Sequence, residues 1–247
     1  MNSSTCTLVP RGLLLVGSLL AMGSSAFALP ITGDLGFSGT QLFSFTLPAG
    51  ANAGSYIDFR LPVDGGNGVM DSDGTTGFFN ILPNNDPGFI KDLATVPNSL
   101  GYSVAPVGAT VSIDNFLAFN SIPTTNIRLT KLPFATSCSP GPFTACVGPF
   151  QLSQNGSHVS VSINILGDIL NGPDSTPFTG QITAQFLNNT IAAVIASASS
   201  ADGVLANSWS GAISTVPEPG TMTMLGIGLI AMVLGGRRAK QRAGSDK

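Results

Sequence analysis

Polar and apolar residues alternate along much of this chain, and the clearest example is the run 157–166. Val159, Val161, Ile163 and Ile165 occupy every second position, and polar side chains stand between them. Successive side chains of a β-strand point to opposite faces, so a period of two is typical of a strand with one buried face and one face in water. The run therefore predicts a half-buried strand.

The same alternation recurs in the run 178–186. Phe178, Ile182, Ala184 and Phe186 share one face, and Thr and Gln side chains share the other. Further strands are predicted where short runs of strand-forming residues are bounded by Gly, Pro and Asn, as turns require, at 43–47, 56–61, 111–119, 127–132 and 207–214.

One helix is predicted, at 190–199. Thr190 is a suitable N-cap for the apolar run that follows, and the stretch ends near Asp202. Several short strands with one wet face, without long helices alternating between them, indicate antiparallel pairing. We therefore expect an all-β fold, an antiparallel β-sandwich or barrel-like domain with one short helix.

The beginning of the chain has the features of a secretion signal. Arg11 precedes the apolar run 13–22, and Ala26 and Ala28 provide the small-x-small pattern that signal peptidase recognises. A buried amphipathic helix is the alternative, but the run has no polar face. We expect residues 1–28 to be a signal peptide cleaved after Ala28, and residues 29–215 to form one exported domain.

The end of the chain contains three physically different parts in a fixed order. Residues 216–219 contain two prolines, each of which lacks an N–H and ends regular structure. Residues 221–234 are apolar and, as a helix, would be about 21 Å long, which is short of the roughly 30 Å hydrocarbon core unless the bilayer thins. Residues 237–242 are mostly basic and are expected to stay in the cytoplasm, which leaves the large domain outside the inner membrane.

This order of parts resembles the PEP-CTERM sorting signal. The residues that carry the resemblance are Val216, Pro217, Glu218, Pro219, Arg237 and Arg238, with the apolar helix between the two groups. The resemblance implies recognition by an exosortase in the inner membrane and cleavage near the Pro-Glu-Pro, followed by movement to the cell surface or extracellular matrix. An ordinary single-span anchor is the alternative reading of residues 216–247.

The interior of the chain also looks like one group of these exported proteins. The matching stretches are 88–93, 178–180 and 208–210, although Phe89 between Gly88 and Ile90 departs from the group's pattern. This resemblance implies a location more than a reaction.

Charge is scarce and negative in the exported domain. Charged residues make up 9% of the chain, against roughly 25% in ordinary soluble domains. Residues 29–215 contain four Lys or Arg and eleven Asp, a net charge of −7. Such a surface repels phosphate backbones, so nucleic acid is not an expected partner.

Two cysteines remain after removal of the signal peptide, Cys138 and Cys146, in a Pro/Gly-rich segment. An oxidising compartment favours a disulfide between them. In the chain-entropy model so short a loop adds only about 2–3 kcal/mol of stability. Half of a metal site is the alternative, but no second Cys or His cluster completes four ligands.

The single histidine, His158, lies on the polar face of its predicted strand beside Ser160 and Ser162. A hydrolase would use His158 as a base and a serine as its nucleophile. Neighbours two apart on one strand are about 6–7 Å apart, too far for the direct hydrogen bond of a catalytic pair. We expect a solvated histidine and no enzyme activity.

The segment 64–74 is rich in Asp and Gly. Asp64, Asn67, Asp71 and Asp73 are weak candidates for calcium ligands, because calcium prefers six to eight oxygen ligands. The bidentate Glu of a calcium loop is absent downstream. We favour an Asp/Gly-rich hairpin turn for this segment and expect no cofactor, with calcium as the alternative.

Three functions are consistent with these features. The first is a structural or interaction protein of the cell surface or of the exopolysaccharide matrix of a biofilm, because neutral hydroxyl and amide side chains hydrogen-bond sugars. The second is a carbohydrate-binding module, with or without calcium, which the small number of Trp and Tyr residues weakens. The third is a secreted hydrolase. The expected partners are signal peptidase and exosortase during export, the inner membrane transiently, and exopolysaccharide afterwards.

Overall fold

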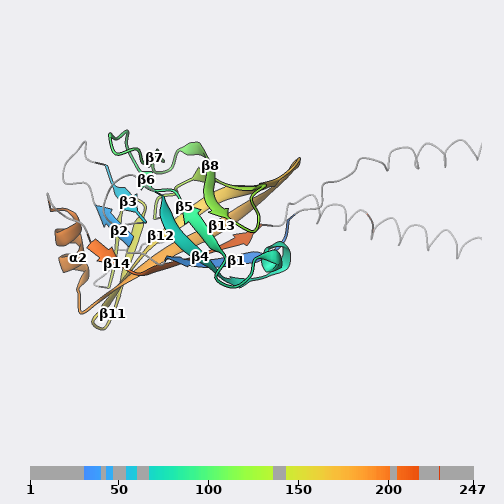
Figure 1. Ribbon diagram of the computed structural model, residues 1–247. Coiled ribbons are helices and arrows are strands. Elements are labelled where there is room, and N and C mark those ends of the chain that lie inside the picture. The colour runs from blue at the N-terminus through green and yellow to red at the C-terminus, as the bar shows by residue number, and fades with distance from the viewer. Residues whose placement is uncertain are drawn as a thin grey trace, which may run out of the picture.

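The structure is a computed structural model, and it describes residues 31–39, 43–46, 54–59, 67–135, 143–200, 205–216 and 228. Strands dominate this part of the chain and form two sheets, a larger one of ten strands and a smaller one of five (Figure 1). The predicted all-β class is confirmed.

Eight strands of the larger sheet close into an antiparallel barrel, in the order β12-β13-β15-β1-β4-β5-β8-β9 and back to β12. These strands are β1 (Asp34–Gly39), β4 (Gly68–Thr75), β5 (Pro87–Ile90), β8 (Thr110–Phe119), β9 (Thr125–Lys131), β12 (His158–Asn171), β13 (Asp174–Leu187) and β15 (Trp209–Thr215). Of the two predicted alternatives, sandwich or barrel, the structure is the barrel.

The long strand β12 closes the barrel because it changes partners along its length. Its first half, from His158 to Ile163, pairs with β11 (Phe150–Asn155), which continues to β10 (Thr144–Val147) outside the barrel. Its second half, from Leu166 to Asn171, pairs with β9. The register shifts between Leu166 and Gly167, where the change of partner occurs.

The smaller sheet lies against the barrel together with the helix α2. Its strands, in spatial order, are β14 (Leu205–Asn207), β2 (Phe43–Thr46), β3 (Tyr56–Asp58), β6 (Leu93–Ala94) and β7 (Ser103–Val104). The helix α2 (Ile191–Ala198) lies at the opposite end of the barrel from the short 3-10 helix η1 (Gly77–Ile81) (Figure 1).

Apolar side chains fill the core. Val159, Val161, Ile163 and Ile165 of β12 are buried, and the polar residues between them are half-buried or exposed. Phe178 and its predicted partners on β13 are buried in the same way. An eight-stranded barrel is just wide enough for its own side chains to fill it, and burying each large apolar side chain contributes roughly 1.5–3 kcal/mol. The ligand-accessible surface is therefore on the outside of the barrel.

The predicted helix and strands are present, with one difference among them. Thr190 caps α2 as expected, because its Oγ1 accepts a hydrogen bond from the Ala193 N–H at 3.2 Å. The predicted strand 207–214 is wrong as a single element, because β14 ends at Asn207 and β15 begins at Trp209, in different sheets. The Asn207 side chain accepts a hydrogen bond from the Ser208 N–H at 2.8 Å, which satisfies the backbone at the break.

Candidate functional site

The outer faces of β12, β13 and β15 form a continuous neutral surface, which we call the polar face. Its residues are Ser160, Ser162, Asn164, Thr179, Gln181, Thr183, Gln185, Ser210, Ala212 and Ser214. They line up across the strands because the register pairs Asn164 with Gln181 and Gln181 with Ala212. The alternation that buries one side of each strand thus collects hydroxyl and amide groups on the other.

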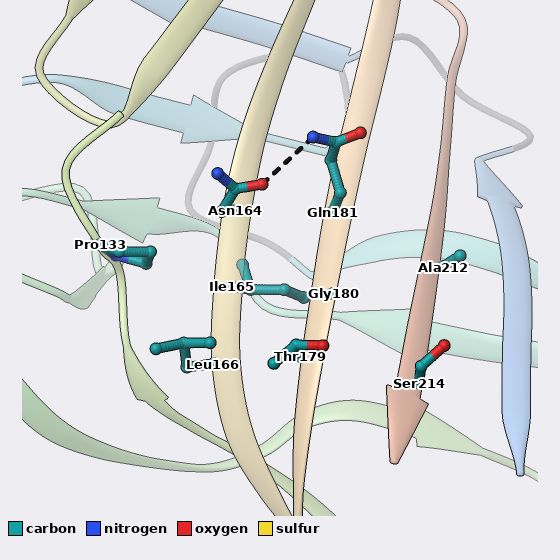
Figure 2. Close-up of a pocket in the computed structure, with 9 residues that line it drawn as sticks. All are labelled: Pro133, Asn164, Ile165, Leu166, Thr179, Gly180, Gln181, Ala212 and Ser214. Carbon is teal, nitrogen blue, oxygen red and sulfur yellow. Dashed lines mark hydrogen bonds between the residues drawn. The ribbon is translucent and has the colours of Figure 1, made fainter. Parts of the chain in front are cut away.

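A groove of about 550 Å³ lies in the polar face, across β12, β13 and β15 (Figure 2). The residues that line it are Pro133, Asn164, Ile165, Leu166, Thr179, Gly180, Gln181, Ala212 and Ser214. No charged residue is among them. The groove therefore offers hydrogen bonds without attracting ions.

Two amide side chains stand at one end of the groove. The Gln181 Nε2 donates a hydrogen bond to the Asn164 Oδ1 at 3.1 Å (Figure 2). A carboxamide has two N–H donors and an oxygen that accepts two hydrogen bonds. Within the described chain the pair makes no other side-chain hydrogen bond, so the remaining donors and acceptors are available to a ligand.

The two sides of the groove differ in polarity. Leu166 and Pro133 form an apolar side, and Ser214 lies on the opposite side (Figure 2). The Ser214 hydroxyl donates a hydrogen bond to Asp34 Oδ1 at 2.5 Å, which fixes its orientation. An apolar side opposite fixed hydroxyl and amide groups matches the two kinds of surface on a sugar ring.

A smaller hollow of about 180 Å³ lies farther along the polar face and is lined by Thr183, Gln185, Ser208, Trp209 and Ser210. Trp209 is only 3% exposed and packs against Phe37 and Phe59, with ring centroids 6.1 and 5.0 Å away. Tyr102 is buried as well. Trp209 and Tyr102 therefore belong to the core and give the polar face no stacking platform.

His158 begins β12 and is exposed, with Ser160 and Ser162 on the same face, as predicted. Among the described residues, no hydrogen bond joins His158 to either serine. The strand register places His158 beside Asn155 and Leu187 instead.

The predicted hairpin turn at 64–74 is wrong for its second half, which is strand β4. Asp71 and Asp73 lie on the outer face of β4. Met70 and Ser72, which alternate with them, are buried. Asn67 is exposed just before the strand, and Asp64 lies outside the described residues. In the part of the chain that the structure describes, no three His, Cys, Asp or Glu side chains are grouped to hold a metal ion.

Cys146 lies in β10 and is half-buried. Cys138 lies outside the described residues. The disulfide between them stays a prediction.

The groove combines residues that the sequence pattern identified with residues that it did not. Asn164, Thr179 and Gln181 were expected on polar strand faces. Pro133 and Ser214 join them only because β9, β12, β13 and β15 are neighbours in the barrel. The pattern of each strand shows which way a side chain points but not which strands lie next to each other.

Comparison with known proteins identifies one segment of the chain. Residues 215–239 match the PEP-CTERM protein-sorting motif. No curated protein and no solved structure matches the chain. The motif indicates an exported protein that is sorted by an exosortase, with its C-terminal segment linked to the membrane before processing.

Of the residues that carry the resemblance to the sorting signal, Val216 is described, and Pro217, Glu218, Pro219, Arg237 and Arg238 lie outside the described residues. The signal peptide 1–28 lies outside them too. Over the ranges that are described, no helix has the length and apolar character needed to cross a membrane.

Proposed function

We propose that the exported barrel is an interaction module of the cell surface or extracellular matrix that binds a neutral polysaccharide on its polar face. The observation that carries this proposal is the groove across β12, β13 and β15, which is lined by amide and hydroxyl side chains and by no charged residue. A ligand that fits it presents many hydroxyl groups and no net charge.

The charge of the domain supports a neutral ligand over an anionic one. The net charge of residues 29–215 is −7. Arg128 on β9 forms an ion pair with Asp168 on β12, with 2.7 Å between Nη2 and Oδ2. The positive charge of Arg128 is therefore already neutralised. Lys131 lies opposite Leu166 in the register and is the other cation described beside the groove, but one lysine does not offset a net charge of −7, so acidic polysaccharides would meet repulsion.

No aromatic residue is among those that line the groove, which favours many weak contacts along a polysaccharide chain over tight capture of one sugar. Each hydrogen bond exchanged with water contributes only about 0.5–1.5 kcal/mol. Binding therefore gains strength from the length of the polysaccharide and from several barrels held close together. This is the behaviour of a matrix protein and differs from that of a high-affinity sugar receptor.

The test is binding of the purified barrel domain to neutral polysaccharide extracted from the producing cells. Gln181→Ala should weaken binding about fivefold to tenfold, because it removes one or two hydrogen bonds of about 0.5–1.5 kcal/mol each. Asn84→Ala, an exposed amide in the loop after η1, is the matched control and should bind like the wild type. Affinity electrophoresis gives the dissociation constants.

Alginate, an acidic glycan, should not bind to any of these proteins. Equal affinity of Gln181→Ala and Asn84→Ala for the neutral polysaccharide would show that the groove is not the binding site. Absence of binding by the wild type would remove polysaccharide recognition altogether.

A further inference from the structure

Residues 31–33 and 215–216 lie side by side at one end of the barrel. The Thr215 N–H donates to the Gly33 carbonyl at 3.1 Å, and the Gly33 N–H donates to Thr215 Oγ1 at 2.9 Å. The Ile31 N–H donates to Thr176 Oγ1 at 2.9 Å, and the Val216 N–H donates to the Pro177 carbonyl at 2.8 Å. The barrel is therefore hydrogen-bonded up to Val216.

The helix η1 belongs to the same end. The Phe78 N–H donates to the Thr32 carbonyl at 2.8 Å, and the Thr76 N–H donates to the Asp34 carbonyl at 2.9 Å. Figure 1 shows η1 beside the start of β1. We call the residues 31–33, 76–82, 176–178 and 215–216 the exit end of the barrel.

The Asp34 carboxylate lies beside the exit end, where it accepts a hydrogen bond from Thr76 Oγ1 at 3.1 Å, and the exit end itself carries exposed apolar side chains. Its described ranges contain no Asp, Glu, Lys or Arg. Ile81, the last residue of η1, is 60% exposed, and Val216 is 38% exposed. Single exposed apolar side chains are common on protein surfaces, so it is their place at the end of the barrel where the sorting motif begins that favours a contact here.

The sorting motif follows the exit end without a spacer. The motif match begins at residue 215, and the Val216 N–H still donates a hydrogen bond to the Pro177 carbonyl of the barrel. The residues 217–219 reach about 10 Å when fully extended. An exosortase that cleaves within this stretch must approach the folded barrel to within that distance.

We propose that the exit end is a docking surface for the exosortase and that Ile81 lies in the contact. The inference rests on the sorting that the motif indicates and does not depend on polysaccharide binding. The exosortase is the favoured partner over the lipid surface itself, because the described ranges of the exit end contain no Lys or Arg to attract anionic lipid headgroups.

The test compares Ile81→Asp with Leu187→Asp in cells that contain the exosortase. Leu187 is also 60% exposed, but it ends β13 at the opposite end of the barrel, so it is a matched control. Ile81→Asp should slow conversion of precursor to mature protein about tenfold, because it places a charge in an apolar contact. Leu187→Asp should be processed at the wild-type rate.

The measured quantity is the fraction of mature protein over time on an immunoblot, and thermal unfolding of both variants verifies that each is folded. Equal processing of Ile81→Asp and the wild type would overturn the proposal.

A flexible spacer separates a docking effect from a folding effect. Eight Gly and Ser residues inserted between Val216 and Pro217 release the motif from the exit end. In this longer chain Ile81→Asp should no longer slow processing. If the substitution slowed processing equally with and without the spacer, the contact would not be its cause and the proposal would fail.

A photo-crosslinking amino acid at position 81 identifies the neighbour directly. The expected product is a covalent adduct with a tagged exosortase, and the same amino acid at position 187 should give none. Adducts with lipid alone would contradict exosortase docking. None of these outcomes depends on the affinity of the polar face for polysaccharide.

Discussion

Gly167 stands where β12 leaves β11 and joins β9. A Cβ atom at this position would lie 2.1 Å from the Arg128 carbonyl oxygen and 2.4 Å from Cζ of Phe178. The first of these is backbone of the neighbouring strand, which cannot move without disturbing the pairing. Glycine is therefore required for the close approach that closes the barrel.

Gly167→Ala should lower the free energy of unfolding by about 1–3 kcal/mol, because the added methyl group overpacks the core and pushes β9 away from β12. Urea denaturation followed by circular dichroism measures the change. Ser162→Ala, on the outer face of the same strand, should alter stability by less than about 0.5 kcal/mol. A Gly167→Ala protein as stable as Ser162→Ala would show that the close approach is not required.

The burial of Trp209 could not be predicted from the sequence. The composition shows one Trp and two Tyr, but it does not show where they lie. Trp209 is buried because Gly39 leaves room for it: a Cβ at Gly39 would lie 1.9 Å from the indole nitrogen. These two residues are far apart in the sequence, so no local pattern could reveal that the tryptophan belongs to the core.

At the scale of elements, the helix α2 follows from local signals. Thr190 precedes a run of apolar residues, and its side chain caps the helix in the expected way. Val194 and Ala198 are buried, so the helix is held by its cap and by packing on one face. Both features lie within one short stretch of sequence and were therefore predictable.

Thr190→Ala should destabilise α2 by about 1 kcal/mol, because the Ala193 N–H loses its hydrogen-bond acceptor. Hydrogen exchange of the Ala193 amide should become faster by about fivefold, the equivalent of about 1 kcal/mol. Thr190→Ser keeps the hydroxyl and should exchange like the wild type. Unchanged exchange in Thr190→Ala would mean that packing alone holds the first turn.

The strand β4 was missed because its composition hid its period. Gly68, Met70 and Ser72 face inward, and Asp71 and Asp73 face outward, so the alternation is present. Gly and Asp are typical of turns, and only one large apolar residue marks the inner face. Pairing with β1 and β5 overrides this weak local preference, as it often does in strands.

At the scale of the whole molecule, alternation predicts buried and exposed faces but does not choose between a sandwich and a barrel. That choice depends on which strands become neighbours, such as Asp34 beside Ser214 and Asn171 beside Thr125. The groove depends on long-range pairing too, because β15 must lie beside β13, and Pro133, which follows β9, must lie beside β12. The fold class was predictable because alternation is a local pattern. The site was not predictable because it depends on which distant strands become neighbours.

The C-terminal signal, in contrast, could be predicted from the sequence, because its parts follow one another along the chain and need no long-range pairing. Their positions relative to the barrel add a physical constraint, since the motif begins at residue 215, where the last strand β15 ends. The roles proposed for the polar face and the exit end both require export of the domain across the inner membrane. Sorting is thus the central claim of the account.

The most direct test is fractionation of cells that produce either the wild type or a chain in which Pro217, Glu218 and Pro219 are replaced by alanine. Ser245→Ala, outside the matched motif, is the control. The wild type and the control should accumulate as the shorter, processed form at the surface or in the medium. The replaced chain should keep its C-terminal segment and remain as the longer form in the inner-membrane fraction. Identical distribution and size of all three proteins would contradict exosortase sorting.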